Sequence, residues 1–130
     1  MLQASSPDEI ALVKFGYLLN MKLHERGRVN CALKNFSGNI ENYETLASFP
    51  FTSESKKMGI LIKNLNTGTI IYIVKGAEIV VENMIKPAVR PSLMEICETL
   101  AMDGLRTLVF AQKVVTQVQA EEFLQKLWKA

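Results

Sequence analysis

The sequence predicts an α+β fold: an antiparallel β-sheet with flanking helices. Three successive segments rich in β-branched and aromatic residues are separated by short turn sequences, which is typical of consecutive hairpins. Segments with helix start and stop signals precede and follow them. An antiparallel sheet built from hairpins leaves a face that helices can cover.

The first helix has a strong start at residues 6–9, which read Ser-Pro-Asp-Glu. Ser6 suits the N-cap, Pro7 suits the first helical position, and Glu9 completes a capping box. The apolar residues that follow continue a helical pattern. We expect this helix to end between residues 21 and 25, before Gly27.

The strands and the remaining helices follow in order along the chain. Turn residues at 37–39 and 64–68 separate apolar runs, so strands are expected at 29–36, 40–49, 57–63 and 69–74. Proline and glycine bound the segments that follow. These predict helices over 77–84 and 92–101, a last strand over 105–112, and a short amphipathic helix over 120–129.

Composition indicates one ordinary globular domain over residues 1–130. The chain has 130 residues, a net charge of +2, and nearly half of its residues are apolar. A charge this small does not indicate nucleic-acid or membrane binding. Cys31 and Cys97 make neither a disulfide framework nor a metal site, and we interpret both as small core residues. His24 is the single histidine, so a histidine metal cluster is excluded.

Lys75-Gly76-Ala77 directly follows the apolar run at 69–74. A lysine beside glycine places an ammonium group next to backbone that can be approached closely, which suits an anionic group such as phosphate. The same tripeptide also suits a simple turn. The pattern by itself leaves both interpretations open.

Phe51 stands between Pro50 and two hydroxyl residues. An aromatic residue just after a strand-breaking proline is expected at a sheet edge, where its ring can stack on a nucleotide base for about 1–3 kcal/mol. The alternative is a core phenylalanine. Phe49, the neighbouring aromatic residue, is assigned to packing. Lys56 follows Phe51 by five residues, and its flexible charge suits steering a phosphate.

Arg106 lies in the run 103–107, Asp-Gly-Leu-Arg-Thr. A guanidinium can hold phosphate oxygens through two parallel hydrogen bonds. The alternative is a structural ion pair with Asp103 or Glu95. The chain carries no Ser/His/Asp set and no Gly-x4-Gly-Lys-Ser/Thr loop, so a hydrolase triad and P-loop chemistry are not indicated.

Together these segments resemble the nucleotide-binding domain of P-type ATPases. The wording Ser-Pro-Asp-Glu-Ile-Ala-Leu-Val is similar to the phospholipid-translocating branch, the P4-type flippases, and the short loops are similar to its compact, Neo1-like and type 9-like members. The resemblance extends from about Ser5 to about Lys113. The family's acceptor aspartate, in an Asp-Lys-Thr-Gly-Thr loop, does not occur in this sequence, and neither do membrane-spanning helices.

The resemblance implies an ATP site made of six residues. Phe51 would stack on adenine, the others would surround the nucleotide, and Arg106 would steer the phosphates; the set is Glu9, Phe51, Lys56, Lys75, Gly76 and Arg106. For Glu9 a purely structural capping role remains open. No residue is expected to be catalytic or to bind metal. Mg²⁺ would be bound outside this chain, and the isolated chain would bind ATP without turnover.

The resemblance also implies a larger parent protein. This chain would be the cytosolic ATP-binding domain of an integral membrane ATPase, in a Golgi or endosomal membrane, whose partners are the phosphorylation and actuator domains of the same chain. The isolated domain is expected to be a monomer without direct membrane or nucleic-acid contact. Two alternatives are a domain from a cation-transporting P-type ATPase and a non-enzymatic α+β interaction module.

Overall fold

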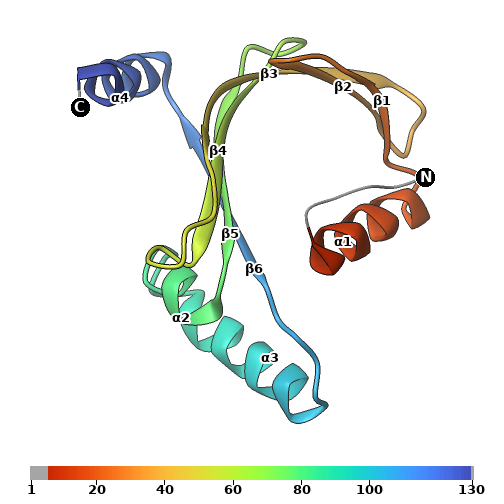
Figure 1. Ribbon diagram of the computed structural model, residues 1–130, viewed down its shortest axis with the longest axis vertical. Helices are drawn as coiled ribbons and strands as arrows, with labels where there is room; N and C mark the ends of the chain where they lie inside the picture. Colours follow the sequence, from red (N-terminus) through yellow and green to blue (C-terminus); the bar gives the residue numbers. More distant parts are fainter. Residues whose placement is uncertain (1–5, 130) are drawn as a thin grey trace.

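The computed structural model describes residues 6–129 and confirms the α+β class. Six antiparallel strands follow one another in chain order across a single curved sheet (Figure 1). The strands are β1 (Lys22–Arg26), β2 (Asn30–Lys34), β3 (Ile40–Phe49), β4 (Lys57–Asn64), β5 (Ile70–Gly76) and β6 (Val109–Val115). The helices are α1 (Pro7–Leu18), α2 (Glu78–Val81), α3 (Arg90–Met102) and α4 (Gln117–Lys129).

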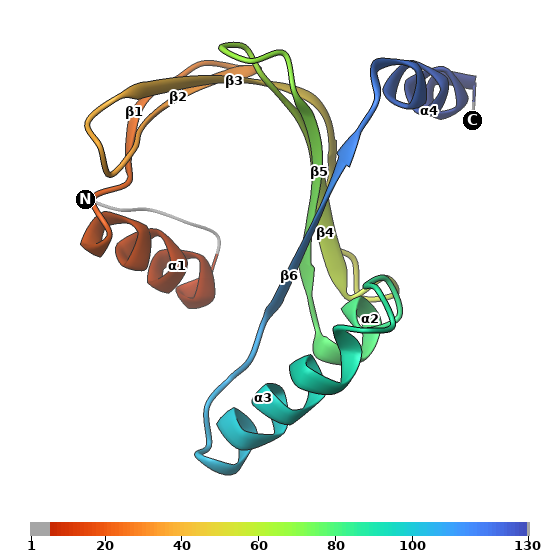
Figure 2. The same cartoon turned by 180° about the vertical axis from the view of Figure 1, so that it is seen from behind.

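One face of the sheet carries both core clusters. Near one end of the central strands, Leu61 and Ile70 pack against Ala120 of α4. Near the other end, Val109 packs against Val81 of α2 and Cys97 of α3, which agrees with the predicted core role of Cys97. Because side chains alternate along a strand, their sequence neighbours project from the opposite face. Figures 1 and 2 show α1 on that opposite side of the curved sheet from α4.

The first helix ends earlier than its sequence suggests. α1 ends at Leu18, and Asn20 adopts a left-handed conformation with φ 61°. The Asn20 and Met21 amides donate to the carbonyls of Tyr17 and Gly16, the hydrogen bonds of a Schellman motif. Residues 22–26, expected as helix or loop, therefore form the edge strand β1. The prediction was wrong because asparagine can take the left-handed position usually filled by glycine.

Further boundaries differ from the prediction: α3 begins at Arg90, β6 ends at Val115, and α4 begins at Gln117. β5 continues through Gly76, so Lys75 and Gly76 are the last two residues of the strand instead of a turn after it. α2 is only four residues long, and its N-cap Ala77 has no side chain that can cap the helix. β6 begins at Val109, four residues later than expected, since residues 103–108 leave α3 through a Schellman motif at Gly104.

The hairpin at the centre of the sheet agrees closely with the sequence. β3 has the predicted bounds, and Gly38 and Gly68 hold positive φ in the turns on either side of the β3–β4 pair. Asn64 closes the second turn by accepting hydrogen bonds from the amides of Asn66 and Thr67. Within the described residues, none of the helices has both the length and the apolar character required to span a bilayer.

Candidate functional site

The predicted site residues gather at one end of the sheet. Gly76 lies opposite Lys57 on β4 and opposite Val109 on β6. The β3–β4 loop, residues 50–56, and the α3–β6 segment, residues 103–108, therefore both extend beyond the same end of the sheet. The start of α1 reaches this end through its side chains.

Lys75 and Glu9 form an ion pair that joins β5 to the first turn of α1. Their side chains are 18% and 32% exposed, so solvent screens this pair less than an ion pair on the open surface. Lys75 is flanked across the strands by Met58 of β4 and Phe110 of β6. These three residues belong to the sheet face opposite the two core clusters.

The capping box is thus only half formed. The Ser6 hydroxyl accepts the Glu9 amide at 3.3 Å, as predicted for an N-cap. The Glu9 carboxylate, however, is directed to Lys75. A purely structural capping role for Glu9 is therefore wrong, because an ammonium partner binds a carboxylate more strongly than a neutral amide does.

Arg106 contacts a different carboxylate from either of those considered. Its Nη1 lies 3.5 Å from Oδ2 of Asp8, and the Arg106 side chain is 82% exposed. The pairing with Asp103 or Glu95 is not what the structure shows, since the Schellman turn at Gly104 directs the chain toward α1. An ion pair this exposed contributes about 0–1 kcal/mol, so Arg106 can exchange Asp8 for an anionic ligand at little cost.

The β3–β4 loop has a defined shape that leaves Phe51 in solvent. Thr52 and Ser55 bond through their hydroxyls at 2.7 Å, and the Ser55 amide donates to the Thr52 hydroxyl. Phe51 is 62% exposed, so the core interpretation of this residue is wrong. Phe49 is the packing residue instead, with its ring 6.4 Å from that of Tyr72 and edge-on to it.

Lys56 closes the loop in a left-handed conformation, φ 54°, which is uncommon for a residue with a side chain. Two backbone hydrogen bonds hold it there: its amide donates to Thr52, and its carbonyl accepts the Ala77 amide at 3.2 Å. The second bond ties the loop directly to the end of β5. Lys56 is exposed and is anchored one strand away from Lys75.

Gly76 is required by packing. A Cβ at this position would lie 2.6 Å from the Lys56 carbonyl oxygen and 2.9 Å from the Lys57 Cα. Contacts this short with backbone cannot be relieved by a side-chain rotation. Gly76 therefore lets β4 and β5 stay close where the lysines gather. Whether its backbone also approaches a phosphate stays a prediction.

The assembled groups suit binding better than bond-breaking chemistry. They present the exposed Phe51 ring, three cationic side chains and two carboxylates. Each carboxylate is already paired: Glu9 with Lys75, and Asp8 with Arg106. Among the described residues, no group of three or more His, Cys, Asp or Glu side chains is placed to hold a metal ion. The donor set at this end of the sheet does not fit Mg²⁺, which prefers several oxygen ligands.

Cavities adjoin the sheet at two places in the described part of the chain. One, of about 520 Å³, lies between α1 and α3; Asp8 and Arg106 line it together with apolar side chains of both helices. The other, of about 670 Å³, lies under α4 on the face opposite Lys75. Lys57 lines this second cavity. Lys57 therefore does not belong to the predicted ATP site.

Sequence reasoning missed Asp8 as a site residue, and Met58 and Phe110 as neighbours of Lys75. Asp8 lies within the predicted helix start, where an acidic residue is favourable in any case. Met58 and Phe110 are located by strand register, which no local pattern in the sequence reveals.

The six-stranded α+β fold agrees with the cytoplasmic N domain of P-type ATPases. The family model described as P-type ATPase, cytoplasmic domain N, matches residues 2–128. The chain belongs to this family.

Its relatives narrow the class. The chain is 41% identical over 121 residues to a probable phospholipid-transporting ATPase IIB of Danio rerio, covering 93% of this chain and 11% of that protein. It is 40% identical over 121 residues to the Mus musculus protein of the same name, covering 93% of this chain and 10% of that protein. It is 41% identical over 121 residues to the phospholipid-transporting ATPase neo1 of Schizosaccharomyces pombe, covering 93% of this chain and 11% of that protein. The chain thus spans about a tenth of the length of these relatives.

Proposed function

We propose that this chain binds ATP for a phospholipid-transporting P-type ATPase. The observation that carries the proposal is the convergence of Lys75, Glu9 and Arg106, which are distant in sequence, at the sheet end where the loop bearing Phe51 begins. Membership in the family and relatives named as phospholipid-transporting ATPases support it. The same names favour lipid transport over cation transport.

In this proposal, Phe51 stacks on adenine, since its ring is 62% exposed. Lys75 and Glu9 lie beside the base and ribose, with Glu9 holding the Lys75 ammonium in place before the nucleotide arrives. Lys56, which is anchored one strand away from Lys75, and Gly76 complete the nucleotide-binding site. Arg106 leaves Asp8 and steers the phosphates, because a phosphate offers it two parallel hydrogen bonds.

The chain's part in the reaction is to hold and orient ATP. The acceptor of the γ-phosphoryl group would be an aspartate on a separate phosphorylation domain, and Mg²⁺ would be held there by groups outside this chain. Phosphoryl transfer depends on such positioning and on neutralised phosphate charge. The parent would be an integral membrane protein of Golgi or endosomal membranes with this domain on the cytosolic side, and the actuator domain would complete its cytosolic part.

A calorimetric titration of the 130-residue chain tests the proposal. We expect ATP to bind with a dissociation constant of roughly 0.1–1 mM, because one stacked base and a few charged contacts, less the cost of ordering, leave about 4–5 kcal/mol. GTP should bind more weakly, and single-stranded RNA should not compete. RNA binding that ATP does not displace would favour the interaction-module alternative.

A second arm uses γ-labelled ATP with Mg²⁺. We expect no released phosphate and no acid-stable label, because the chain supplies no acceptor. Turnover abolished by Lys75→Ala would refute the division of labour proposed here, since one of the chain's own carboxylates would then do the chemistry. Turnover unchanged in that variant would identify a contaminating enzyme.

A further inference from the structure

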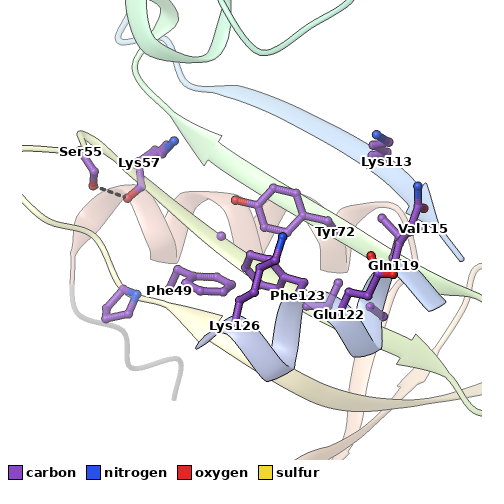
Figure 3. A pocket seen from close by; sticks show the side chains of 14 residues that line it. Phe49, Ser55, Lys57, Tyr72, Lys113, Val115, Gln119, Glu122, Phe123 and Lys126 are labelled. Atoms are coloured by element: carbon purple, nitrogen blue, oxygen red, sulfur yellow. Dashed lines mark hydrogen bonds between the residues drawn. The ribbon is translucent and has the colours of Figure 1, made fainter. Parts of the chain in front are cut away.

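Figure 3 shows the cavity under α4. Its sheet residues belong, by strand register, to the face opposite Lys75. Leu61, Tyr72 and Val115 line it from the sheet, and Ala120 and Phe123 line it from α4. Its volume of about 670 Å³ is within the range of small-molecule sites. The proposed nucleotide site does not use it.

Aromatic side chains give the cavity its apolar wall. The Phe49 ring lies 6.4 Å from Tyr72 at 74°, and 5.7 Å from Phe123 at 63°. Both contacts are edge-to-face, so neither ring pair offers parallel faces between which a planar base would fit. The wall therefore suits a flexible aliphatic body better than a nucleotide base.

Gly59 makes room for this wall. A Cβ at position 59 would lie 2.6 Å from the Tyr72 hydroxyl oxygen and 3.0 Å from its ring. Any other residue would push the Tyr72 ring away from β4. The Tyr72 ring thus lies over a strand position that carries no side chain.

The charged residues around the cavity are mostly cationic. Lys57 of β4, Lys113 of β6 and Lys126 of α4 line it with a single carboxylate, Glu122 (Figure 3). In the part of the chain that the structure describes, none of the three lysines forms a salt bridge. The Lys57 ammonium lies 3.7 Å from the Met84 sulfur. Three elements therefore bring uncompensated positive charge to one apolar cavity.

We propose that the cavity under α4 binds an amphipathic anion, an aliphatic chain with an anionic head, at a site separate from that of ATP. The aliphatic body lies against Leu61, Phe49 and Phe123. The head lies among the lysines, within reach of the Tyr72 hydroxyl. Such a ligand satisfies both features of the cavity, the apolar wall and the excess of cations.

Calorimetric titration of the 130-residue chain with dodecanoate, below its micelle concentration, tests the proposal. We expect saturable binding that persists when the chain is saturated with ATP. Acetate, which has the head alone, should not bind. Dodecyltrimethylammonium, which has the same chain and a cationic head, should bind at least about tenfold more weakly, because like charges repel in the cavity.

The paired substitution Lys113→Gln with Lys126→Gln should weaken dodecanoate about two- to fivefold per lysine, as expected for exposed ion pairs. Lys34→Gln, an exposed lysine of β2 remote from the cavity, is the matched control and should change nothing. Both lysines are exposed, so the double variant should keep the fold. Gly59→Ala should reduce binding further by displacing Tyr72.

The proposal is overturned if the cationic and anionic detergents bind equally, since the lysines would then have no role. It is also overturned if Lys34→Gln weakens binding as much as the double variant does. Competition between ATP and dodecanoate would show that the two ligands share one site, which contradicts a separate cavity.

Discussion

Replacing Phe51 with alanine separates the binding role of this ring from any packing role. Phe51 is 62% exposed, so it hides less than half of its surface. A fully buried aromatic side chain hides about 150–250 Å², so Phe51 hides on the order of 60–100 Å². At about 25 cal/mol per Å², truncation costs about 1.5–2.5 kcal/mol of unfolding free energy as an upper bound. A core phenylalanine would cost about 3–5 kcal/mol.

ATP binding should weaken as well, by a free energy of similar size. Stacking contributes about 1–3 kcal/mol, so the dissociation constant should rise about 5- to 150-fold. Thermal melting and ATP titration on the same sample measure both quantities. Phe36→Ala is the matched control, because Phe36 is 75% exposed in the β2–β3 turn, at a distance from the site. That variant should bind ATP normally.

Two results would refute this reasoning. Retained ATP affinity in Phe51→Ala would remove the ring from the site. A melting decrease of the size expected for a core residue would show that the loop packs more tightly than its exposure indicates.

Three further outcomes are expected. Glu9→Gln should leave the helix start intact but weaken ATP several-fold by titration, because the Lys75 ammonium loses the partner that holds it. Arg106→Gln should weaken ATP and phosphate-bearing analogues together while the melting temperature stays nearly constant, since the arginine is 82% exposed. Burial, together with a hydrogen bond to Glu41, raises the pKa of Tyr43 to about 12. Because the folded pKa is above the unfolded value near 10, the stabilisation from Tyr43 is present below pH 10 and is lost as pH rises toward 12. Urea unfolding of Tyr43→Phe should accordingly show a smaller loss of stability over that interval than the native chain.

Controls for these variants come from β1 and the turn after it. Glu25→Gln and Arg28→Gln alter exposed residues of the same types and should leave ATP affinity unchanged. Equal weakening by Arg28→Gln would indicate a general charge effect in place of a contact by Arg106. Unchanged affinity in Glu9→Gln would return Glu9 to a structural role as the partner of Lys75.

Local signals in the sequence were sufficient for most of the secondary structure. Ser6 caps α1 as expected, and Gly38, Gly68 and Gly104 take positive φ where turns or helix ends require it. The bounds of β3 follow from turns and a proline that act within a few residues. Each of these caps and turns depends on residues that are close in the sequence, so the sequence alone was enough to predict them.

Tertiary structure decided the pairings that make the site. Glu9 and Lys75 are 66 residues apart, and Asp8 reaches Arg106 only because α1 lies on the face of the sheet opposite the core clusters. The extension of β5 through Gly76 depends on the close approach of Lys56, at the end of the β3–β4 loop, and of Lys57, the first residue of β4. Sequence alone determined which residue types were present at each element end, since capping and turn formation are local. Only the register of the sheet, set by long-range packing, determined which of them meet.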